Sequence, residues 1–150
     1  GLLAELDPAN AATYAANAAA GIDRLKVLDA RLRARLAPAT DLLLVTQHDA
    51  YGYFLHRSGL TATASLADAE GAAPGVARLH DLRTRMAGAS VGCLFSEVGS
   101  AADLLDSVDP DGRFARAELD PLGRNVPAGP GFYETLIANL GNAIADCASR

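Results

Sequence analysis

Several polar residues of this 150-residue chain directly follow short apolar runs, at positions where a metal ion could bind. These residues are Gln47, His48, Asp49, Ser65, Ser96, Glu97 and Asp120. If the apolar runs are parallel strands, their carboxyl ends share one edge of a sheet, and ligand sites lie just outside that edge. Imidazole and carboxylate ligands together suit zinc and similar divalent ions. His48 and Asp120 are therefore the candidate metal ligands.

The same positions also have a purely structural interpretation, because polar residues at that edge often cap the helices that follow. Asp49 is well placed to cap a helix. His56 lies near the end of the same predicted helix and His80 in the middle of another, so both are expected to be exposed to solvent. No two histidines have the HExxH spacing, which excludes a zinc protease on motif grounds.

One stretch matches a catalytic motif by letter. Gly88-Ala89-Ser90-Val91-Gly92 fits GxSxG, the nucleophile elbow of α/β-hydrolases, which needs a strand before the serine and a helix after it. Here the predicted helix comes first and the strand follows, so Ser90 belongs at the wrong edge of the sheet. The sequence also has no GxGxxG fingerprint and no Walker A loop. We find no nucleophile with a suitable base and expect neither enzymatic activity nor an enzyme substrate.

Short apolar runs that alternate with helical periodicity predict an α/β fold. The expected strands are residues 42–46, 60–64, 91–95 and 113–119, and the expected helices are 49–58, 74–88, 101–108 and one that begins after Pro130. Residues 65–73 are expected to form a loop. This alternation requires right-handed crossovers and a parallel sheet. The fold class is therefore a parallel four-stranded sheet flanked by helices, and the order of its strands is left open.

A long amphipathic helix is predicted ahead of the sheet. Asp7-Pro8 supplies an N-cap and a proline at the first helical position, and Pro38 ends the helix. Its apolar residues recur at spacings of three and four, at Ile22, Leu25, Leu28, Leu32 and Leu36. The expected organisation is a single domain, with this backbone helix over residues 1–38 and an α/β metal-binding lobe over residues 39–150.

Composition excludes several classes of function. The net charge is -5 with both signs interspersed, so the chain lacks the basic patch of a nucleic-acid-binding protein. Its apolar runs are far shorter than the roughly 20 residues that span a bilayer. The two cysteines, Cys93 and Cys147, are too few for a disulfide framework and too far apart for a CxxC motif. From the residues alone, two buried free thiols are the simplest expectation.

The segment His48-Asp49-Ala50-Tyr51-Gly52-Tyr53-Phe54 resembles a signature of the ZnuA-like family, the zinc-binding solute-binding proteins of ABC transporters. In that family the signature follows the first strand of the C-terminal lobe. Further matching segments occur in the same order, at residues 6–14, Pro74-Gly75, Phe95-Ser96-Glu97 and residues 119–123. Together they cover nearly the whole chain, which thus resembles the C-terminal lobe of such a protein.

The resemblance implies that His48 and Asp120 are two zinc ligands. Glu97 and Asp49 are candidates for a supporting role beside them. Manganese-binding relatives have a carboxylate in place of His48, so the histidine favours zinc. The remaining ligands, normally histidines, come from an N-terminal lobe that this sequence does not contain. The family commonly continues with Pro-Gln after the glutamate, whereas this chain has Val98-Gly99.

The resemblance also implies a function, a location and a disulfide. The expected function is zinc binding as one lobe of a periplasmic or otherwise extracytoplasmic protein that delivers metal to an ABC permease. No signal peptide is visible in this chain, and zinc binding by the isolated lobe is expected to be weak. The alternative is a short stand-alone ZnuA-like interaction module that has lost transport and high-affinity metal binding. Zinc-binding members carry a disulfide that resembles Cys93–Cys147 in position and separation, which predicts the same bond here.

Overall fold

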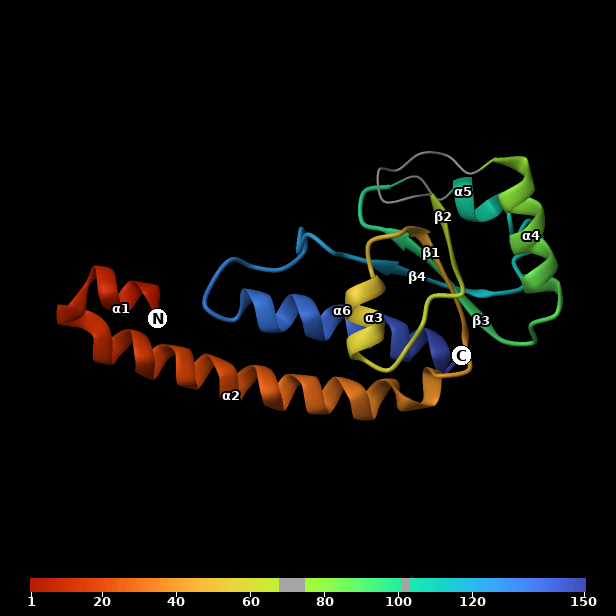
Figure 1. Cartoon of the computed structure of the whole chain (residues 1–150). Helices are drawn as coiled ribbons and strands as arrows, with labels where there is room; N and C mark the ends of the chain where they lie inside the picture. The colour runs from red at the N-terminus through yellow and green to blue at the C-terminus, as the bar shows by residue number, and fades with distance from the viewer. Residues whose placement is uncertain (68–74, 101–102) are drawn as a thin grey trace. The chain divides into compact units, whose positions relative to one another are not determined.

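Four parallel strands form the sheet that positions the candidate ligands (Figure 1). The computed structural model describes residues 1–67, 75–100 and 103–150. The strands are β1 (Leu43–His48), β2 (Ala64–Ala67), β3 (Gly92–Glu97) and β4 (Ala115–Leu119), in the spatial order β2-β1-β3-β4. Every strand pairing is parallel, and Thr46 pairs with both Ser65 and Phe95. The predicted fold class is confirmed, and all four strands end at one edge.

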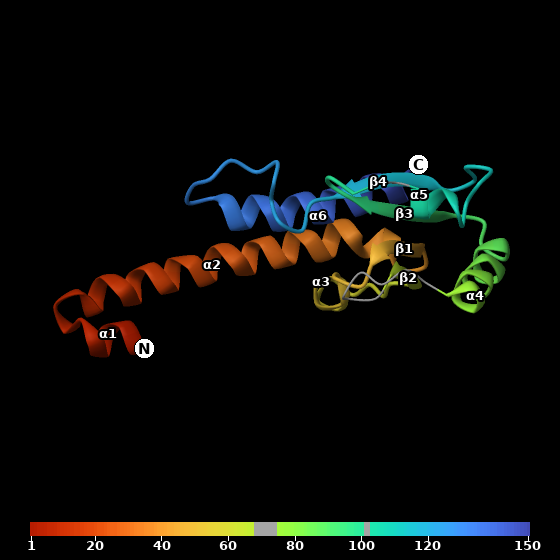
Figure 2. The ribbon, with the colours of Figure 1, turned by 90° about the horizontal axis from the view of Figure 1, so that it is seen from above.

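Helices cover both faces of the sheet because side chains alternate along each buried strand. On one face, Leu44, Cys93 and Phe95 pack against α3 (Gly52–Arg57) and α6 (Phe132–Ala148). On the other face, Val45 and Leu94 pack against α4 (Val76–Ala87) and α5 (Asp103–Asp106). Figure 1 shows the two pairs of helices on opposite sides of the strands, and Figure 2 shows α6 alongside β3 and β4.

The predicted disulfide is present. Cys93, the second residue of β3, is bonded to Cys147 in the last turn of α6, with 6.1 Å between the two Cα atoms. Both cysteines are buried, so neither is the free thiol that the residues alone suggested. The bond fixes the end of α6 to an inner strand of the sheet.

The N-terminal part of the chain is helical, as predicted, but its long helix begins later. A short helix, α1 (Leu2–Leu6), and a 3-10 turn over Pro8–Asn10 precede α2 (Ala11–Leu36). Instead of capping backbone N–H groups, the Asp7 carboxylate accepts hydrogen bonds from the side chains of Asn10 and Tyr14, each at 2.8 Å. Helix α2 ends two residues before Pro38, as that proline requires.

Packing divides the chain into two compact units, Gly1–Arg31 and Leu32–Arg150. The sheet, its flanking helices and the last turn of α2 belong to the second unit. The expected single domain, with a boundary at residue 38, stays a prediction. Among the described residues, no helix is both long enough and apolar enough to cross a membrane.

The prediction for the second strand was wrong by four residues at its start and three at its end. The strand is Ala64–Ala67 rather than 60–64, and Ser65 lies inside it instead of following it. The reason is that Leu60 packs against α3 in the core, while Thr63 exchanges hydrogen bonds with the backbone of Leu44 and thereby sets the start of the pairing. The rest of the expected loop, residues 68–73, and Pro74 lie outside the described residues. Helices α3, α4 and α5 are all shorter than predicted.

Candidate metal centre

The carboxyl ends of β1 and β3 bring His48 and Glu97 together. These strands are neighbours in the sheet, and the His48 Nδ1 atom lies 2.8 Å from Glu97 Oε1. Both side chains keep some exposure, 28% for His48 and 17% for Glu97. A neutral imidazole whose Nδ1–H donates to a carboxylate carries its free lone pair on Nε2. The geometry therefore leaves His48 Nε2 as the atom that can coordinate a metal.

Tyr51 forms a hydrogen bond to the same carboxylate of Glu97. Its ring is buried, and its hydroxyl donates to Glu97 Oε1 at 2.5 Å. Burial raises the pKa of the Tyr51 hydroxyl, and so do the hydrogen bond to Glu97 and the negative charges of Glu97 and Asp120. The hydroxyl thus stays protonated and donates to Glu97. Since one carboxylate oxygen accepts from both Tyr51 and His48, the imidazole is fixed in its orientation.

The backbone of Glu97 is also tied to β1. Its N–H donates to Gln47 Oε1 at 3.2 Å, and the Ser100 hydroxyl lies 2.6 Å from the same oxygen. Gln47 is the residue before His48, so these hydrogen bonds join the carboxyl ends of β1 and β3. Sequence reasoning placed Gln47 at this edge of the sheet but gave no role to Tyr51 or Ser100. Tyr51 lay within the matched segment, but its contact with Glu97 spans 46 residues and depends on strand register.

Asp120 follows β4 and is held by the loop that comes after it. Its two carboxylate oxygens accept hydrogen bonds from the N–H groups of Arg124, at 2.9 Å, and Asn125, at 2.8 Å. The hydrogen bond from Asn125 is the main cause that lowers the pKa of Asp120, with smaller contributions from Arg124 and Gly123. The carboxylate is therefore ionised at neutral pH. Each oxygen retains a further lone pair that can meet a cation.

The turn around Asp120 depends on a glycine. Gly123 has a φ of +64°, a region that glycine adopts without steric cost. A Cβ atom there would lie 2.4 Å from Phe132 Cζ, so the turn packs directly against the start of α6. The packing of Gly123 against α6 thus fixes the conformation of the Asp120 loop.

The structure does not assemble a complete metal site from the residues it describes. No group of three or more His, Cys, Asp or Glu side chains in that part of the chain is arranged to hold a metal ion. His48 and Asp120 lie at the ends of strands that β3 separates. Asp49 is exposed and does not cap α3, which begins after Tyr51. His56 and His80 are exposed, as predicted.

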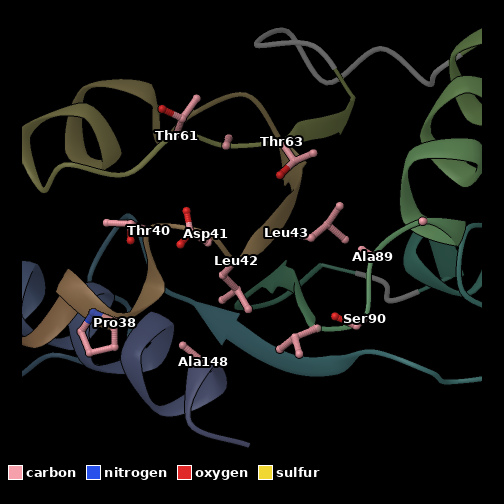
Figure 3. A pocket seen from close by; sticks show the side chains of 13 residues that line it. Pro38, Thr40, Asp41, Leu42, Leu43, Thr61, Thr63, Ala89, Ser90 and Ala148 are labelled. Carbon is pink, nitrogen blue, oxygen red and sulfur yellow. The ribbon is translucent and has the colours of Figure 1, made fainter.

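The GxSxG serine lies where its motif order predicted. Ser90 is in the turn before β3, at the amino end of the strands, and so lies at the edge away from His48. It lines a groove of about 700 Å³ together with Thr40, Asp41 and Thr63 (Figure 3). Among the described residues that line this groove, Asp41 is the only titratable side chain. No histidine is among the described residues that line the groove, so none of them can serve as the general base for Ser90.

Comparison with known proteins gives consistent matches over nearly the whole chain. Residues 2–147 match the model of the family ZnuA, described as zinc-uptake complex component A, periplasmic. The high-affinity zinc uptake system protein ZnuA of Brucella suis is 38% identical over 149 residues, which are 99% of this chain and 44% of that protein. The protein of the same name from Paracoccus denitrificans is 36% identical and is covered to 45%.

Solved structures agree with the sequence matches. The solute-binding protein FpvC of Pseudomonas aeruginosa, solved in complex with Mn²⁺, superposes with a TM-score of 0.74 at 30% identity. The match covers 98% of this chain and 54% of FpvC. A crystal structure of ZnuA superposes with a TM-score of 0.79 at 24% identity and shows the same fold. This chain spans about half the length of the relatives it matches, and it belongs to the ZnuA family of zinc-uptake solute-binding proteins.

Proposed function

We propose that this chain binds zinc as one lobe of a solute-binding protein for ABC-type metal uptake, with His48 and Asp120 as its two ligands. The contact between His48 Nδ1 and Glu97 Oε1 is the observation that supports this most strongly. Histidines that ligate metals almost always donate their other ring N–H to a carboxylate, a carbonyl or water. In this chain the arrangement occurs at the edge of the sheet where ligands bind.

Glu97 and Tyr51 position the ligand rather than contact the ion. A carboxylate on Nδ1–H fixes the imidazole tautomer and makes Nε2 a stronger base. Tyr51 holds that carboxylate from the buried side by a hydrogen bond to the same oxygen. Asp49, which the sequence suggested for a supporting role, is exposed and lines an open hollow of about 510 Å³ with Tyr53 and His56. In the proposed site its contribution is limited to negative charge.

Asp120 supplies charge as well as a ligand atom. Its carboxylate is ionised, and its lone pairs beyond the two backbone hydrogen bonds are free for a cation. Because these bonds come from the backbone of its own loop, the carboxylate needs little rearrangement when an ion binds. An imidazole nitrogen in the ligand set favours zinc over manganese, which prefers oxygen ligands.

Two ligands leave the proposed zinc site incomplete. Zinc sites in proteins normally use three or four protein ligands. Relatives with about twice the length of this chain are named as zinc uptake proteins, and their family is described as periplasmic. We therefore infer that a second lobe supplies the remaining ligands, that the whole protein works outside the cytoplasm and that it delivers zinc to an ABC permease. On its own, the chain binds zinc weakly.

A second candidate is a short stand-alone interaction module of the same family, without transport and without tight metal binding. The observation that favours it is that no group of three or more His, Cys, Asp or Glu side chains in the described part of the chain is arranged to hold a metal ion. The two candidates differ in the coding sequence expected upstream of the segment that encodes this chain. A coding region for a histidine-containing lobe upstream favours the uptake protein, whereas a start codon directly ahead of Gly1 favours the module.

The experiment that tests the proposed zinc site is an NMR titration of the purified chain with zinc. We expect amide shifts centred on His48 and Asp120 that are lost in His48→Ala and in Asp120→Asn. His56→Ala is the matched control, because His56 is an exposed histidine eight residues later. Equal binding by His48→Ala and by the unmodified chain would rule out His48 as a ligand.

A further inference from the structure

Arg124 connects the loop that follows β3 with the loop that follows β4. Gly99, in the first of these loops, has a φ of +82°, a conformation that side-chain-bearing residues rarely adopt. A Cβ atom at Gly99 would lie 2.7 Å from Arg124 Nη1 and 3.8 Å from Arg124 Cζ. The guanidinium therefore lies directly over the open face of the glycine, in space that any other residue at position 99 would occupy.

The backbone of Arg124 keeps its side chain next to Asp120. The Arg124 N–H donates to Asp120 Oδ1 at 2.9 Å, and the two residues are four positions apart along a tight loop. The positive charge of Arg124 is also one of the causes that lower the pKa of Asp120. Among the described residues, the hydrogen-bond donors to the Asp120 carboxylate are backbone N–H groups. The guanidinium thus acts on Asp120 through its charge and leaves the carboxylate oxygens uncovered.

We propose that Arg124, held over Gly99, is a fixed positive charge that weakens divalent-cation binding at Asp120 and favours release of the ion. This inference rests on the proposed zinc site. A guanidinium is always protonated, so its repulsion of a dication is present at every working pH. The repulsion is twice that felt by a monovalent ion, because Coulomb energy scales with the product of the charges.

The size of the effect follows from the exposure of the side chain. Arg124 is exposed, so water and salt screen its charge and the interaction is modest. Removal of the charge is expected to tighten zinc binding about 2- to 5-fold at physiological salt, and by more at low salt. Because a charge does not distinguish two dications, zinc and manganese binding should tighten by the same factor. Loss of a histidine ligand, by contrast, would weaken zinc binding selectively.

The variants separate charge from shape. Arg124→Gln removes the charge but keeps the backbone N–H that binds Asp120, and Arg124→Lys keeps the charge. Gly99→Ala places a methyl group where Arg124 Nη1 lies and so displaces the guanidinium without removing it. Arg85→Gln is the control for net charge, because Arg85 pairs with Asp81 in the last turn of α4, near the amino end of β3.

The test is a zinc titration of these variants by NMR at low and physiological salt, with manganese binding measured from the EPR signal of the free ion. We expect tighter binding of both ions by Arg124→Gln and a smaller gain in Gly99→Ala. Arg124→Lys and Arg85→Gln should match the unmodified chain. Equal affinities of Arg124→Gln and the unmodified chain at low salt, or the same gain in Arg85→Gln, would overturn the inference.

The outcome also separates this inference from the proposed site. If His48→Ala and Asp120→Asn lose zinc binding while Arg124→Gln binds like the unmodified chain, the zinc site stands and the role of Arg124 fails. If neither the unmodified chain nor Arg124→Gln shows shifts at millimolar zinc, both proposals fail.

Discussion

Reduction of the Cys93–Cys147 disulfide should strongly destabilise this fold. The two cysteines are 54 residues apart, and the segment between them contains β3, β4 and most of α6. Closing a loop of that length lowers the entropy of the unfolded chain by an amount worth about 4 kcal/mol at 25 °C. For a protein of this size, that loss corresponds to a fall in melting temperature of about 8–16 °C.

The assay is urea denaturation of the oxidised and reduced chain under otherwise identical conditions. The Cys93→Ala/Cys147→Ala double variant is the comparison, and it should lose somewhat more stability because both cysteines are buried in the core. Intact mass after alkylation establishes whether native protein carries free thiols. A reduced chain that unfolds at the same urea concentration as the oxidised chain would refute this reasoning, as would two alkylated thiols in native protein from an oxidising compartment.

Three further predictions follow from single side chains. Glu97→Gln should weaken zinc binding about 10- to 100-fold, because a neutral acceptor replaces the carboxylate that holds the His48 Nδ1–H; the measurement is the NMR titration with zinc, and an unchanged affinity would exclude the positioning role. Gly141→Ala should cost about 1–3 kcal/mol in urea unfolding, because the new methyl group would lie 2.2 Å from Leu32 Cδ2, and an unchanged midpoint would contradict this packing. The raised pKa of Tyr51 stabilises the fold below the ordinary tyrosine value of 10.0, and this stability is lost as pH rises above it. Urea midpoints between pH 8 and roughly pH 11 should therefore fall more steeply for the unmodified chain than for Tyr51→Phe, and parallel curves would refute the coupling.

The sequence predicted the parts of the fold that depend on local pattern. Apolar runs ahead of His48 and Glu97 marked two buried strands, and the proline at position 38 marked the end of the long helix. The second strand failed because an apolar residue, Leu60, belongs to the turn after α3 rather than to the sheet. Hydropathy alone does not distinguish these two environments.

The contacts that complete the candidate site are non-local and could not be predicted. The hydrogen bond between Tyr51 and Glu97 requires β1 and β3 to be neighbours, and strand order was not available from the pattern of the sequence. The structure also shows what Gly99 accommodates, namely the guanidinium of Arg124. Such close approaches depend on loop geometry, which residue types alone do not specify.

The most direct test of the proposed zinc site is the identity of the histidine nitrogen that coordinates the ion. Nitrogen NMR of the imidazole rings distinguishes Nδ1 from Nε2 in each of the three histidines. We predict that metal-free His48 carries its proton on Nδ1, bonded to Glu97, and that zinc shifts the His48 Nε2 signal while Nδ1 stays protonated. Zinc that shifts only His56 or His80, or that coordinates His48 through Nδ1, would contradict the site proposed for this chain.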